Sequence, residues 1–198
     1  DFSFINYNEA ENRMAEYDRI ANKSEKILEE LPDKYKAAFY ELVFYPVKGA
    51  TLMNKKMLTA QQNRWYALQG RASTELYANK TQSYHDSIDS YTVHYNQMLN
   101  GKWSHMMSLA PGWVATYQNM PPVNTTAISS GANMQIFIPG KDSDYGVTSL
   151  NVLPCLNPYT KQKSFIELYN RGNKAFQWKA SAKQEWINLD KISGKTLL

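Results

Sequence analysis

Few residues in this sequence have the types and spacing that chemistry requires, and most of them fall on expected helix faces. His85 and Asp89 are four residues apart, so one face of a helix would carry both side chains, as metal ligands on a helix do. A zinc site needs about three protein ligands, and no second segment offers a matching Glu-x-x-His or His-x-x-x-His pair. We interpret the pair as a surface hydrogen bond, and we predict neither a metal site nor a cofactor.

Carboxylate pairs such as Glu29-Glu30 and Asp86 with Asp89 raise the question of glycoside hydrolysis. That reaction needs two carboxyl groups that face each other across a sugar. These acids lie instead on polar helix faces, where solvated charge is usual. The sequence also lacks a Gly-rich phosphate loop, a nucleophile elbow and a Cys/His/Asn set, and its one cysteine is Cys155. We therefore assign no catalytic residue.

Aromatic residues are the more suggestive feature, with 14 Tyr and 5 Trp in 198 residues. Trp103, Trp113 and Tyr117 cluster where the helical half of the chain gives way to a half rich in β signals. Their rings suit stacking on the apolar faces of sugars, and they suit packing between domains equally well. Two interpretations follow, a sugar-binding platform or an inter-domain aromatic patch.

Charge and hydropathy exclude two classes of partner. The 22 basic and 18 acidic residues give a net charge of +4 and are interleaved. A nucleic-acid partner would require a concentrated basic patch, so none is expected. No stretch approaches the ~20 apolar residues of a membrane span, so none is predicted.

The first half reads as three long helices. Asn8 and Glu11 resemble a capping box, and apolar residues then recur every three or four positions up to Leu31. A second helix follows Pro32-Asp33 and runs to Gly70, with a kink expected at Pro46. A third ends at Asn100-Gly101. Short connections imply antiparallel neighbours, so we predict an up-down-up bundle over residues 1–118.

The second half changes to short β-rich runs punctuated by Gly and Pro. A tight reversal is expected at 170–173, and a turn at Ser193-Gly194. These signals predict an antiparallel β-sandwich over residues 119–198, truncated at its C-terminal edge. The predicted fold class is therefore α+β in two modules. The runs are residues 134–138, 147–153, 165–169, 175–182 and 186–189.

Two stretches of the sequence are similar to a known family. The first comprises residues 31–47, 63–67 and 101–107, and the second comprises residues 153–159, 166–172, 176–182 and 186–187. In this order they resemble the C-terminal region of glycoside hydrolase family 115, the xylan α-1,2-glucuronidases. Residues 108–117 depart from the family's pattern.

The resemblance implies a region of a secreted or periplasmic bacterial enzyme that removes glucuronic acid or its 4-O-methyl ether from glucuronoxylan. In that family the catalytic carboxylates lie in an upstream barrel domain, so the implied partners are that missing domain of the same polypeptide and a second copy in a homodimer. The implied role here is non-catalytic support of the barrel and of the dimer. Two alternatives are a carbohydrate-binding module and a free-standing helical interaction protein.

Overall fold

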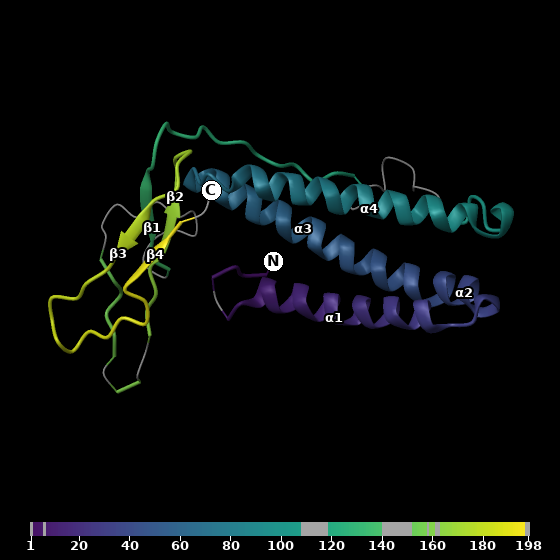
Figure 1. The fold of residues 1–198 in the computed structure, drawn as a ribbon, viewed down its shortest axis with the longest axis horizontal. Helices are drawn as coiled ribbons and strands as arrows, with labels where there is room; N and C mark the ends of the chain where they lie inside the picture. Colours follow the sequence, from purple (N-terminus) through teal and green to yellow (C-terminus); the bar gives the residue numbers. More distant parts are fainter. Residues whose placement is uncertain are drawn as a thin grey trace. The chain divides into compact units, whose positions relative to one another are not determined.

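The computed structural model describes residues 2–5, 7–107, 119–139, 152–157, 159–160 and 163–196, in which helices precede short strands along the chain (Figure 1). Two compact units can be distinguished. The helical unit comprises residues 1–62 and 76–123, and the second unit comprises residues 63–75 and 124–198. The last residues of helix α3 and the turn after it therefore belong to the same unit as the strands.

Helix α1, Glu9–Glu30, does not begin with the predicted capping box. Asn8 has a left-handed backbone, with φ of 52°, and its side chain makes no capping hydrogen bond. An N-cap side chain reaches the first turn from an extended backbone, which Asn8 does not have. Ser3 performs part of the role, because its carbonyl accepts from the Ala10 N–H at 3.1 Å and its N–H donates to the Glu9 carboxylate at 3.0 Å.

The expected kink near Pro46 takes the form of a change of helix type. Helix α2, Asp33–Phe39, continues into a π-helix, η1, Tyr40–Phe44, and then into α3, Tyr45–Gln69. The Tyr45 N–H donates to the Tyr40 carbonyl, five residues back. Proline has no N–H, and its ring clashes with the carbonyl four residues earlier in an α-helix, so a wider turn accommodates Pro46 where a regular α-turn would not.

Ion pairs join α1 to α3 within the helical unit. Lys48 Nζ lies 3.0 Å from the Glu25 carboxylate, and Lys55 Nζ lies 2.7 Å from that of Asp18. Residue numbers rise along α3 as they fall along α1, so these two helices are antiparallel.

Helix α4, Thr74–Gly101, packs against α3 through polar contacts. The Tyr45 and Thr92 hydroxyls lie 2.9 Å apart, and the Thr81 hydroxyl donates to that of Thr59 at 3.1 Å. This pairing is also antiparallel. The backbone leaves helical geometry at Met98, close to the predicted stop.

The strands form two small antiparallel sheets in the second unit (Figure 1). Strand β1, Met134–Phe137, pairs with β2, Glu167–Asn170, so that Phe137 faces Glu167. Strand β3, Gln177–Lys179, pairs with β4, Ser193–Lys195. The reversal predicted at 170–173 therefore lies between strands of different sheets and does not close a hairpin.

Two local predictions in this region are wrong. Residues 186–189 form no strand, and Trp186 is 74% exposed in a turn. Ser193 and Gly194, expected in a turn, belong to β4 instead. A Cβ on Gly194 would lie 2.9 Å from the Trp178 indole, so the bare glycine lets the ring cover the facing strand. The strand predicted at 147–153 falls mostly outside the described residues.

Three long helices followed by small antiparallel sheets confirm the α+β class. No helix in the described part of the chain is long and apolar enough to cross a membrane.

Candidate functional site

Side chains of the second unit converge on Arg71, which follows the end of α3. Gly70 leaves the helix with φ of 68°, a conformation that glycine adopts without strain. Arg71 is 3% exposed, and its guanidinium donates to both oxygens of the Glu167 carboxylate in β2, at 2.5 and 2.7 Å. Its Nε donates to Gln69 Oε1. This bidentate ion pair couples the end of the helix to the sheet.

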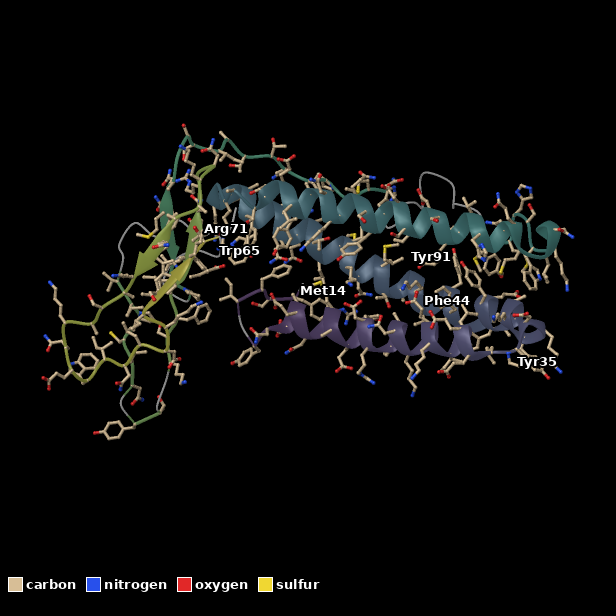
Figure 2. The ribbon with its side chains drawn as sticks, viewed as in Figure 1. Met14, Tyr35, Phe44, Trp65, Arg71 and Tyr91 are labelled. Atoms are coloured by element: carbon tan, nitrogen blue, oxygen red, sulfur yellow. The ribbon has the colours of Figure 1, made fainter. Side chains whose placement is uncertain are left out.

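Aromatic rings surround the same guanidinium. Its central carbon lies 4.1 Å from the ring centroid of Tyr66, 4.4 Å from that of Tyr169 and 5.3 Å from that of Trp65. Trp65, labelled with Arg71 in Figure 2, in turn packs edge-on against Phe137 at 5.6 Å. Burial raises the pKa of Tyr169, and the positive charge of Arg71 opposes part of that rise. The Arg71 centre, meaning Arg71 with Glu167 and these rings, is the packed interior of this unit.

Asn63 forms a second polar junction, eight residues before Arg71. Its side chain is fully buried, and its amide donates to the carbonyls of Thr74 at 2.8 Å and Asn124 at 3.1 Å. Its oxygen accepts from the Asn124 N–H at 2.7 Å. The side chain thus replaces backbone partners for the segment that enters the β region.

The loops of the second unit approach each other very closely. A Cβ on Gly172 would lie 2.1 Å from the Gly131 carbonyl oxygen, so no other residue fits. The Asn170 side chain accepts from the N–H groups of Gly172 at 2.8 Å and Asn133 at 3.1 Å, while Asn173 accepts from Gly131 at 2.8 Å. In these contacts the asparagine side chains serve as acceptors for backbone N–H groups of the neighbouring loops.

The helical unit has an aromatic core of its own. Tyr40, Phe44 and Tyr95 are buried together, and the half-buried Trp103 packs against them with its ring 6.1 Å from that of Tyr95. The Tyr40 hydroxyl donates to the Tyr91 carbonyl at 3.1 Å. Burial, with smaller effects from neighbouring tyrosines, raises the pKa of Tyr40 to about 12.

Lys56 is the most chemically unusual residue of the helical unit. It is fully buried, and its ammonium donates to the Asn119 carbonyl at 3.3 Å. Burial lowers its pKa, and the charge of Asp89 opposes that shift. This hydrogen bond joins α3 to the segment around Asn119.

The candidate residues predicted from the sequence do not come together in one site of the described structure. Trp103 lies in the helical core, whereas Trp113 and Tyr117 lie outside the described residues, so the aromatic patch stays a prediction. His85 Nε2 lies 3.9 Å from the Asp89 carboxylate, which is too long for the predicted hydrogen bond. No group of three metal-ligating side chains occurs among the described residues.

Comparison with known proteins is informative at the level of solved structures. No protein-family model matches the sequence, and no curated protein does. Among solved structures, a family GH115 4-O-methyl-α-glucuronidase with specificity for decorated arabinogalactans is 33% identical over 62% of this chain, with a TM-score of 0.50. The resemblance to glycoside hydrolase family 115 is confirmed. The matched region covers 15% of that GH115 chain.

Sequence reasoning gave no role to Arg71, Glu167 or Asn63, although Asn63 and Glu167 lie within the stretches that resemble the family. Glu167 carries a usable signal, because it is the one acid within the apolar run 165–169, and a buried acid requires a partner. Nothing local to Arg71 or Asn63 distinguishes them from surface residues.

Proposed function

We propose that this chain is a non-catalytic accessory region of a GH115-like α-glucuronidase. The observation that carries the proposal is the Arg71 centre. It brings together Trp65 and Tyr66, from one stretch that resembles the family, with Glu167 and Tyr169 from the other. These four residues, which lie in the stretches that resemble the family, thus pack against Arg71 in the interior, as expected of a supporting domain.

The proposed parent protein releases glucuronic acid, or its 4-O-methyl ether, from a decorated polysaccharide. Glucuronoxylan is the substrate implied by the sequence motifs, while the similar structure belongs to an enzyme specific for decorated arabinogalactans. We propose an upstream catalytic barrel on the same polypeptide as the main partner, a second copy in a homodimer as another, and a secreted or periplasmic location.

The finer architecture belongs to the same proposal. Residues 1–118 would form an up-down-up bundle, and residues 119–198 would form part of an antiparallel β-sandwich. Support comes from the antiparallel pairing of α1, α3 and α4 and from the two-stranded sheets, whose edges would accept additional strands.

An activity assay separates this proposal from a catalytic role. Release of uronic acid from glucuronoxylan and from glucuronidated arabinogalactan should be measured for the 198-residue chain and for the whole gene product. We expect release by the whole product alone. Hydrolysis by the 198-residue chain, or no release by the whole product from either polysaccharide, would overturn the proposal.

A variant of the whole product tests the supporting role directly. Arg71→Met should lower its thermal stability while leaving KM unchanged, because the Arg71 centre does not touch substrate in this proposal. Tyr7→Phe, at a residue 89% exposed, is the control and should change neither quantity. A raised KM with unchanged stability would place Arg71 near the substrate.

A further inference from the structure

The helical unit contains a groove with the chemistry of a sugar-binding site. Its volume is about 390 Å³, within the ~300–1,000 Å³ of small-molecule sites. The π-helix η1 contributes Tyr40 and Phe44, α4 contributes Tyr91 and His94, and α1 contributes Glu29. Figure 2 labels Phe44 and Tyr91 of this groove.

The floor of the groove is aromatic. The Tyr40 and Phe44 rings of η1 lie 5.2 Å from each other, and Phe44 meets Tyr91 edge-on at 5.6 Å. Tyr91 is only half-buried, so part of its ring remains accessible. Short π-helical segments occur often at functional sites.

The charges of the groove argue against a charged ligand. Lys48 is paired with Glu25 at 3.0 Å, and its ammonium already lies 5.8 and 5.7 Å from the ring centroids of Phe44 and Tyr91. A second cation over these rings would be repelled by Lys48. An anion would meet the exposed carboxylate of Glu29, which has no ion pair within the described part of the chain.

The remaining polar groups suit hydroxyls. In the described part of the chain, the Ser90 and Tyr91 hydroxyls, the His94 ring nitrogens and the Glu29 carboxylate have no hydrogen-bond partner. Hydroxyls both donate and accept, and the carboxylate accepts, so together they match a ligand that does both. A sugar ring has such groups around its edge and an apolar face for the tyrosine ring.

We propose that this groove binds a neutral sugar unit of a polysaccharide, with Tyr91 as the stacking surface and Glu29 as the main hydrogen-bond acceptor. The inference goes beyond the accessory role and does not depend on it.

Nuclear magnetic resonance titration of the 15N-labelled chain tests the proposal. The probes are xylotriose and β-1,3-galactotriose as neutral sugars, trigalacturonate as an anionic sugar and spermidine as a cation. We expect saturable shifts of the amides of residues 25–29 and 90–94 with at least one neutral sugar. Trigalacturonate should bind about threefold more weakly, because the Glu29 carboxylate would repel it.

Two variants make the assignment specific. Glu29→Ala should weaken binding of the neutral sugar about tenfold, since hydrogen bonds to charged groups are the stronger kind. Alanine favours helix, and the site is exposed, so the fold should be retained. Glu30→Ala is the matched control, since the neighbouring Glu30 does not line the groove and pairs with Lys26 at 3.8 Å, and it should bind as the wild type does.

Three results would overturn the proposal. They are the absence of saturable shifts with both neutral sugars, equal binding by the Glu29→Ala variant, and tighter binding of spermidine or trigalacturonate at these amides. A spermidine-specific response would indicate a partner's basic side chain instead. None of these results would alter the uronic-acid release assay, so the two proposals fail separately.

Discussion

The Arg71–Glu167 ion pair should respond unequally to removal of its two partners. The Arg71 side chain is 4% exposed, whereas that of Glu167 is 34% exposed. Glu167→Leu strands a buried guanidinium, for which a cost of about 4 kcal/mol in the free energy of unfolding is expected. Arg71→Met leaves the Glu167 carboxylate without its partner, but water can reach that group. With the loss of the cation–π contacts, we expect this variant to lower the free energy of unfolding by about 2 kcal/mol.

The double variant should recover part of this loss. Replacing both partners by apolar side chains leaves no stranded charge, so we expect about 3 kcal/mol in place of the additive ~6 kcal/mol, a coupling of about 3 kcal/mol. Urea denaturation monitored by tryptophan fluorescence measures all three variants, because Trp65 lies in the same cluster. A larger loss for Arg71→Met than for Glu167→Leu, or strict additivity, would refute the reasoning.

Three further perturbations have definite expected outcomes. Asn63→Leu leaves its buried backbone partners unsatisfied and should lower the free energy of unfolding by about 3 kcal/mol in urea titration. Gly172→Ala places a methyl group against a backbone carbonyl and should lower the melting temperature, whereas Gly49→Ala, with nothing within 4 Å of the added carbon, should raise it. Folding raises the pKa of the Tyr40 hydroxyl to about 12, so the unfolded state loses this proton first and the free energy of unfolding falls as pH rises above about 10. Tyr40→Phe should make that fall shallower in thermal melts at alkaline pH. The exposed Tyr7 is the control, and Tyr7→Phe should leave the fall unchanged.

The helical part of the fold was largely predictable because its signals are local. Apolar residues at intervals of three and four predict the helices, and the break between α1 and α2 lies at Pro32 as expected. The strands were less predictable. β4 contains a Ser-Gly pair that normally marks a turn, and it forms a strand because the Trp178 ring covers Gly194 from the facing strand.

The candidate sites were also only partly predictable from the sequence. Among Trp103, Trp113 and Tyr117, only the first can be placed, and it packs into the helical core. The groove lined by Glu29 and Tyr91 was not anticipated, because it forms where three helical segments meet and where η1 widens the turn. No single segment of the sequence contains that arrangement.

The sequence by itself determined the helix boundaries to within a few residues, the α+β class, the absence of a recognisable catalytic motif and the resemblance to family 115. These depend on periodicity, turn chemistry and residue identity, which act over short distances along the chain. Tertiary structure alone decided that Arg71 pairs with Glu167, 96 residues away, and that Tyr40, Phe44 and Tyr91 share one groove. Such partners are selected by burial and by the need to neutralise buried charge, and both conditions exist only once the chain has packed.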